Sequence, residues 1–341
     1  MRKTDRRLDA TPAGGAQALG RRPGRGRLPT VRADFFLDPA ERLSERERAL
    51  MSAMLHCLVV ELAERIRADL PGAAPTRDND HDLVVELNRF GLLDEPELIA
   101  LLLRRAEEER IAAAATARAG RSEARVLQGL VGHENGQVSA AAMALILARS
   151  RRRDRFGQCL LAFDDLPETT AAALVHRVAA AVKAEGGDGD RSVTDSSAAL
   201  IAAYDRAKSV DTLADALAAA LAEAGVLDDA LLLASAHEGD VALLAHLLAH
   251  PAEVAGAIAE AELLSGDPLS IITLLRMAKV SRQVAAGILA AIGDLLGVDD
   301  PAAALALFAA LKDPEIEEAH VLLTSDPAYR SALALLETRH G

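Results

Sequence analysis

Apolar residues recur at fourfold spacing in the first half of the chain, and this spacing predicts amphipathic helices. Five of them fall on one helical face: Leu50, Met54, Leu58, Leu62 and Ile66. A Ser-x-x-Glu sequence at residues 44–47, which is a helix-start signal, stands in front of them. We therefore predict a long helix from about residue 45 to residue 70. Related patterns predict helices at residues 81–90, from residue 96 onward, 122–132, 136–148 and 167–185.

Aspartate–proline pairs punctuate the last third of the chain. They occur at residues 267–268, 300–301, 313–314 and 326–327, and the last three are thirteen residues apart. Aspartate is a favoured N-cap and proline is favoured in the first turn, so each pair predicts the start of a helix of about ten residues. Brief helices with short connections are typical of repeat proteins. We therefore predict an all-α fold, an array of short antiparallel helices that forms a HEAT-like α-solenoid.

The composition supports this fold class. Aromatic residues make up 2% of the chain and Trp is absent, whereas Ala and Leu, both strong helix formers, dominate. Cys57 and Cys159 cannot form a disulfide framework, which fits a reducing cytoplasm. The longest uncharged apolar run, residues 136–148, is shorter than the ~18 residues that a membrane span needs. We therefore expect no membrane insertion and a cytoplasmic location.

Charge and Gly-rich stretches predict four segments. Residues 1–37 are expected to form a disordered basic tail, and residues 38–185 an N-terminal helical domain. The Gly-Gly-Asp-Gly-Asp sequence at 186–190 predicts a linker over residues 186–197. Residues 198–341, with eight basic and 21 acidic residues, are expected to form an acidic C-terminal helical-repeat domain. Such a domain favours basic partners over nucleic acid.

Five arginines within seven positions are the strongest candidate for a partner-binding site: Arg149, Arg151, Arg152, Arg153 and Arg155. They stand between the apolar segment 136–148 and a second helix start, where Asp165 is the expected cap and Pro167 the first-turn residue. Like charges at this density are favourable only in water or beside anions. Three interpretations remain open: a solvated helix end, docking onto acidic surface of this chain or of a partner, and binding of a phosphate-bearing ligand or nucleic acid.

Two stretches resemble a known family. The family is a bacterial all-helical one, catalogued as domain of unknown function 2336. The chain resembles it in residues 45–51 and 56–59, and again in residues 155–156 through 165–167 with 173–177. The resemblance covers roughly residues 45–300. It implies a fold of HEAT-like helices and no established reaction, cofactor or ligand.

Motifs for chemistry are weak. The chain has no P-loop, dinucleotide loop, kinase signature or Gly-x-Ser-x-Gly elbow, so we predict no catalytic residues and no cofactor. His246 and His250 are four residues apart and could share a helix face, but no His-Glu-x-x-His motif surrounds them, and we predict no metal site. Residues 107–110, Glu-Glu-Glu-Arg, are interpreted as a solvated helix face.

We therefore expect a non-catalytic helical-repeat protein that binds a protein partner or acts as a scaffold or regulator. The alternative is a regulatory sensor that binds an anionic small molecule or nucleic acid through residues 149–155. An enzyme with a site that no motif identifies is third. The sequence predicts neither the partner nor the oligomeric state.

Overall fold

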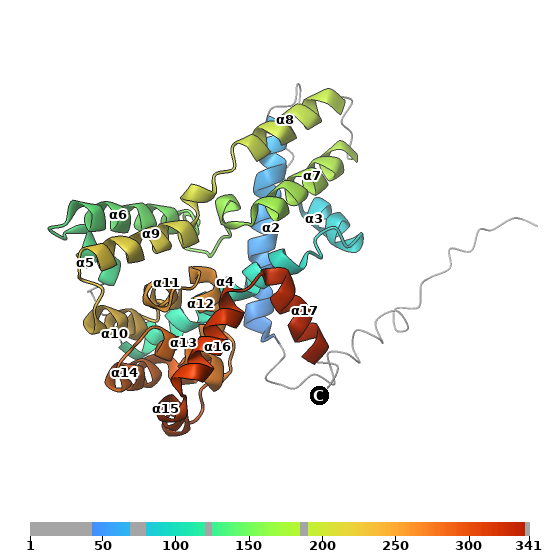
Figure 1. The fold of residues 1–341 in the computed structure, drawn as a ribbon. Helices are drawn as coiled ribbons and strands as arrows, with labels where there is room; N and C mark the ends of the chain where they lie inside the picture. Colours follow the sequence, from blue (N-terminus) through green and yellow to red (C-terminus); the bar gives the residue numbers. More distant parts are fainter. Residues whose placement is uncertain (1–42, 69–79, 120–124, 185–189, 338–341) are drawn as a thin grey trace, which may run out of the picture. The chain divides into compact units, whose positions relative to one another are not determined.

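The computed structural model describes residues 43–68, 80–119, 125–184 and 190–337, which form sixteen α-helices (Figure 1). Of these, the seven N-terminal helices are α2 (Glu45–Ala68), α3 (Asp80–Arg89), α4 (Pro96–Ala119), α5 (Val126–Val131), α6 (Gly136–Ser150), α7 (Glu168–Ala184) and α8 (Asp190–Ala202). The helices after them are α9 (Val210–Glu223), α10 (Asp229–Glu238), α11 (Val241–Ala252), α12 (Gly256–Leu263), α13 (Pro268–Met277), α14 (Arg282–Ile292), α15 (Pro301–Ala310), α16 (Asp313–Thr324) and α17 (Pro327–Glu337).

The described residues contain no strand, so the predicted all-α class is confirmed. Their one isolated β-bridge joins Arg153 and Cys159. Short 3-10 helices, η2 (Phe163–Asp165), η3 (Arg206–Lys208) and η4 (Gly293–Leu296), complete the regular structure. The helix predicted from Ser122 begins at Val126 within the described residues, and Ser122 itself lies outside them.

Three of the four aspartate–proline pairs cap helices as predicted. Asp267 and Asp300 each accept two backbone N–H groups at the start of α13 and α15, and Asp326 accepts the N–H of Ala328 at 2.7 Å. The prediction for Asp313 is wrong by one residue. Lys312 is the N-cap of α16, because the side chain of Glu315, three residues on, accepts the Lys312 N–H at 2.8 Å.

Two clusters of buried apolar residues form the core. The first joins α2, α3, α7 and α8 with the N-terminal part of α4, and its fully buried members include Met54, Leu62, Leu83 and Val178. The fourfold pattern predicted for α2 therefore faces this cluster. Cys159 lies at its edge, with its Sγ atom 3.7 Å from the Met54 sulfur, and both cysteines are free thiols.

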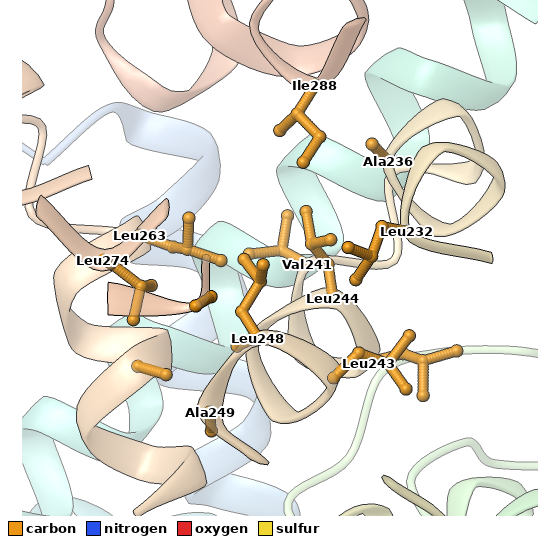
Figure 2. Packing of buried hydrophobic residues seen from close by; sticks show 14 of the residues in the cluster. Leu232, Ala236, Val241, Leu243, Leu244, Leu248, Ala249, Leu263, Leu274 and Ile288 are labelled. Atoms are coloured by element: carbon orange, nitrogen blue, oxygen red, sulfur yellow. The ribbon is translucent and has the colours of Figure 1, made fainter. Parts of the chain in front are cut away.

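The second cluster surrounds α11. Every residue from Val241 to Ala249 is buried, and Figure 2 shows α11 side chains beside Leu232 and Ala236 of α10, Leu263 of α12 and Leu274 of α13. A helix that is apolar on all sides must be covered on all sides. Accordingly, α11 contacts α9, α10, α12 and α13, together with α4.

The clusters do not follow the segment boundaries expected from the sequence. Residues 190–197, expected to belong to a linker, are the first turns of α8, and Val193 and Leu200 of that helix belong to the first cluster. Helix α4 contributes Leu98 to the first cluster and Ile111 to the second. The tail predicted at residues 1–37 and residues 186–189 of the predicted linker lie outside the described residues.

The HEAT-like arrangement stays a prediction. Helices α11, α12 and α13 contact one another in succession, as stacked repeats do, but α10 also packs against α14 and α2 against α7. Within the described ranges, no single helix is long and apolar enough to cross a bilayer. Helices α11 and α12 meet that requirement only as a pair, with a bend of 118° between them.

Candidate functional site

The five candidate arginines do not form one surface. Arg149 and Arg152 turn inward, whereas Arg151, Arg153 and Arg155 are exposed. Arg149 binds Asp240 through both terminal nitrogens, at 2.5 and 2.9 Å. Asp240 is also the N-cap of α11, so this ion pair ties the end of α6 to the start of α11. Burial alone would raise the pKa of Asp240, but the charge and hydrogen bonds of Arg149 outweigh it and lower that pKa.

Arg152 is the most deeply buried of the five, with a side chain that is 2% exposed. Its Nε donates to the Asp165 carboxylate at 2.6 Å, and its terminal nitrogens lie 3.6 Å from Glu108 and 3.8 Å from Asp211. Arg152 therefore offers no surface to a partner. Arg149 thus pairs with an aspartate of the acidic C-terminal half of its own chain, whereas the one carboxylate that Arg152 hydrogen-bonds, Asp165, lies outside that half.

Asp165 does not cap the helix that follows it. Its Oδ2 accepts from Arg152, and its Oδ1 accepts the N–H of Val210 at 2.9 Å, at the start of α9. Helix α7 begins only at Glu168. The carboxylate predicted to start one helix thus joins the loop after α6 to another helix.

Helix α4 supplies the rest of the buried network. Arg104 donates to Asp211 and to Glu260, each at 3.0 Å, and Arg105 pairs with Glu108. The interpretation of residues 107–110 as a solvated face is wrong for Glu108, which is 8% exposed. Burial opposes its ionisation, but Arg105, Arg152 and Arg104 together hold the pKa of Glu108 below its usual value.

Glu260 behaves in the opposite way. Burial raises its pKa well above the usual value, and the neighbouring charge of Glu108 raises it further against the effect of Arg104. The side chain, on α12, is 1% exposed. The network therefore contains one carboxyl with a raised pKa, Glu260, beside two with lowered pKa values, Glu108 and Asp211.

The exposed arginines lie on a tight turn, residues 151–158, which we call the arginine loop. The Leu160 N–H donates to the Arg152 carbonyl at 2.8 Å, and the Asp154 N–H donates to the Gln158 carbonyl at 3.0 Å. Inside the turn, the Asp154 side chain accepts the N–H groups of Phe156 and Gln158, both at 2.8 Å. These bonds give the loop a defined conformation in an otherwise helical protein.

The tip of the arginine loop presents Phe156, which is 74% exposed. The Arg155 guanidinium stacks on its ring, 4.7 Å from the centroid. Arg153 donates to Glu109 at 2.7 Å, and Arg151 donates to the Lys208 carbonyl at 2.6 Å. The contact with Lys208 brings η3, with its own basic side chains, beside the arginine loop. The sequence pattern did not indicate this neighbour, because η3 lies more than fifty residues further along the chain.

The two histidines considered as metal ligands do not come together. His246 is buried, with a side chain that is 1% exposed, whereas His250 faces outward from the same helix. The groups beside His246 are instead Asp211, Asp215 and Glu260. Asp211 and Asp215 are four residues apart on α9, a spacing that could have been noticed, but nothing in the apolar pattern of α12 marks Glu260.

An open cavity of about 560 Å³ lies against α16, beside the ends of α11 and α13. Its ionisable lining residues include both acidic and basic groups: Glu253, Arg276, Lys279, Asp313, Glu317 and His320. Arg276 already pairs with Asp313 at 3.3 Å and stacks on the Phe308 ring. This mixture selects no ligand charge, so the candidate site is the arginine loop and the network beneath it.

The fold and the site define an all-helical protein with a buried arginine–carboxylate network and a basic loop above it. Residues 84–314 match the family described as "Uncharacterised protein conserved in bacteria (DUF2336)", and the chain belongs to that family. The resemblance seen in the sequence is thereby confirmed. The chain matches none of the curated proteins and none of the solved structures.

Proposed function

We propose that this protein is a non-catalytic, helical binding protein of the bacterial cytoplasm, and that it binds an acidic protein partner through the arginine loop. The observation that carries the proposal is the tip of the loop, where Phe156 is 74% exposed and Arg155 stacks on it. Aromatic and arginine side chains dominate the energetics of protein interfaces. An exposed aromatic ring on a loop that is already ordered loses little conformational entropy on binding.

Charge indicates the kind of partner. The chain carries a net charge of −13, and most of its acidic excess lies in residues 198–341. Against this background, Arg151, Arg153 and Arg155 form a local basic surface next to Lys208. Such a surface attracts an acidic segment, while the acidic remainder repels nucleic acid. We therefore expect an acidic segment with at least one apolar side chain to contact Phe156.

A HEAT-like stack of the short C-terminal helices belongs to the same proposal. The succession of contacts from α11 to α13 supports it, and extended repeat surfaces commonly bind proteins. The buried network supports a scaffold role, because its charges are already paired within the chain and hold the base of the loop in place.

The partner can be captured with a photo-crosslinking amino acid at position 156 in the native cell, and then purified for titration. The variant R151E/R153E/R155E should bind it at least about 100-fold more weakly, whereas F156A should lose about 10-fold without any change in charge. The matched control is R89E/R125E/R282E, which makes the same charge change at exposed arginines elsewhere and should lose less than about 3-fold.

Equal losses in the loop and control variants would show that only net charge matters, and would refute the proposal. Retention of full affinity by the loop variant would refute it too. Nucleotides and oligonucleotides should give flat titrations. A saturable, salt-sensitive interaction with one of them would favour the sensor alternative instead.

A further inference from the structure

Three potential metal ligands, two of them buried and one partly exposed, meet beside the network under the arginine loop. Asp211 of α9, His246 of α11 and Glu260 of α12 each place one potential ligand atom within 4.8 Å of the other two. The side chains of His246 and Glu260 are both 1% exposed. Carboxylates cluster in many proteins without a ligand, so the hydrogen bonds around each group decide what the cluster can hold.

One polar atom of each group is fixed by the protein. His246 Nδ1 lies 2.6 Å from the Asp215 carboxylate. Arg104 donates to Oε2 of Glu260 and to Oδ2 of Asp211, each at 3.0 Å. These bonds hold the imidazole and both carboxylates in one orientation each.

Two of the other polar atoms are buried and accept or donate no hydrogen bond in the geometry of the structure. Within the described part of the chain, His246 Nε2 and Glu260 Oε1 are buried and unpartnered. Asp211 Oδ1 lies 3.8 Å from Arg152 Nη2, beyond hydrogen-bonding distance. A buried polar atom without a partner costs about 1–3 kcal/mol, so two of them in one place require an explanation.

The backbone around His246 fits a fixed imidazole. Gly256 begins α12, and a Cβ atom added there would lie 2.0 Å from His246 Nδ1. The ring is therefore seated against the backbone at Gly256, where any side chain would displace it. This close approach explains why glycine stands at the first position of the helix.

We propose that Asp211, His246 and Glu260 bind a divalent transition-metal ion, with Zn²⁺ as the best fit. One imidazole nitrogen and two carboxylate oxygens form a ligand set that suits Zn²⁺, whereas Mg²⁺ and Ca²⁺ prefer oxygen ligands alone. An imidazole whose other nitrogen faces a carboxylate is the common second-shell arrangement of zinc sites. The two carboxylates offset the charge of the ion, and Arg104 orients both of them.

The proposed site also has a route for the ion. Asp215 is 55% exposed and Asp211 is 25% exposed, so the surface lies next to the cluster. The competing explanation needs no ion, because the Glu260 carboxyl also forms a side-chain hydrogen bond with Glu108. The two explanations give opposite results in the experiment below.

The test uses the purified full-length chain, stripped of metal with a chelator and titrated with Zn²⁺ by calorimetry and with Co²⁺ by visible absorption. We expect one high-affinity equivalent per chain and a rise of at least ~2 °C in the unfolding midpoint. The H246Q variant should lose at least about 100-fold in affinity, and D215A, a change at an exposed position, about 10-fold to 100-fold. H250Q, on the same helix but facing outward, is the matched control and should bind like the unchanged chain.

Absence of a stoichiometric site in the unchanged chain would refute the proposal. Equal losses in H246Q and H250Q would refute it as well. The Co²⁺ spectrum of the unchanged chain is decisive even if H246Q does not fold, because a thiolate charge-transfer band would assign the ion to a cysteine instead. The loop variant R151E/R153E/R155E should keep full Zn²⁺ affinity, so failure of the metal site and failure of the proposed partner binding can be told apart.

Discussion

Replacement of Arg152 by methionine tests whether the buried network stabilises the fold. Methionine keeps most of the length of the side chain but removes the charge and all donors. Breaking a buried ion pair on one side costs about 3–5 kcal/mol, because the partner is left charged and buried. Glu108 would still pair with Arg105 and Asp211 with Arg104, so the cost falls mainly on Asp165, which is 3% exposed.

Asp165 would keep the hydrogen bond from the Val210 N–H. We therefore expect R152M to lower the free energy of unfolding by about 3 kcal/mol, the low end of the range for a broken buried ion pair. Urea unfolding followed by circular dichroism measures it, provided that the slope with urea is unchanged. The matched control is R155M, the same substitution at the exposed tip of the loop, which should change stability by less than about 0.5 kcal/mol.

A double-mutant cycle separates the ion pair from general packing. If Arg152 and Asp165 interact as the 2.6 Å hydrogen bond indicates, R152M/D165N should be at least about 1.5 kcal/mol more stable than the sum of the single losses predicts. A loss below about 1 kcal/mol for R152M, or strict additivity in the cycle, would contradict the reasoning.

Three further changes probe other parts of the fold. Burial raises the pKa of Glu107 to about 7 in the folded protein, whereas the ordinary value, which applies to the unfolded chain, is 4.5. Between these two pH values the folded protein binds more protons than the unfolded chain, so the free energy of unfolding falls as the pH rises from 4.5 to 7. The E107Q variant should therefore be more stable at pH 8 than the unchanged chain by about 1–2 kcal/mol, after allowance for solvent screening, and equal to it at pH 4 in urea titrations. Gly239 has a φ of +67°, and a Cβ there would lie 2.5 Å from an α4 side chain, so G239A should lower the free energy of unfolding by about 2–4 kcal/mol. Gly225 has a similar φ of +69° but open space around it, so G225A should lower it by only about 1 kcal/mol. D300A removes the N-cap of α15 and should lower the free energy of unfolding, measured from the thermal midpoint, by about 1 kcal/mol. D313A removes no N-cap and should lower it by less than about 0.5 kcal/mol. Equal losses in the two variants would contradict the helix start that we assign to α16.

The helices themselves could be predicted because they depend on local signals. The fourfold pattern from Leu50 to Ile66 and the caps at Asp267 and Asp300 identified helices at the positions where they occur. At Asp313, the same aspartate–proline pattern predicted the wrong N-cap, because the decisive group was the Glu315 side chain two residues further along. Local signals thus predict the presence of a helix start more reliably than they identify the residue that caps it.

The candidate site could be predicted only in part, because its pairings are long-range. The density of arginines marked residues 149–155, but which of them are buried depends on partners outside that stretch: Asp240 for Arg149, 91 residues away, and Asp165 for Arg152, 13 residues away. Glu108 was assigned to solvent because its neighbours are charged, and only the tertiary contacts of α4, including the ion pair with Arg152, reverse this assignment. The ligand atoms around His246 come from three helices, and no single stretch of sequence contains them.

Helix α4 has a consequence for experiments that divide the chain into fragments. It contributes Leu98 to one apolar cluster and Ile111 to the other, while α8 completes the first cluster from beyond residue 190. A fragment that ends near residue 185 would lack α8, which completes the first cluster, and α9, against which α6 packs. The complementary fragment would lack α4 and α6, which contribute to the second cluster. Neither piece would retain a whole core, so we expect the two fragments to be recovered as a folded protein only when they are co-expressed.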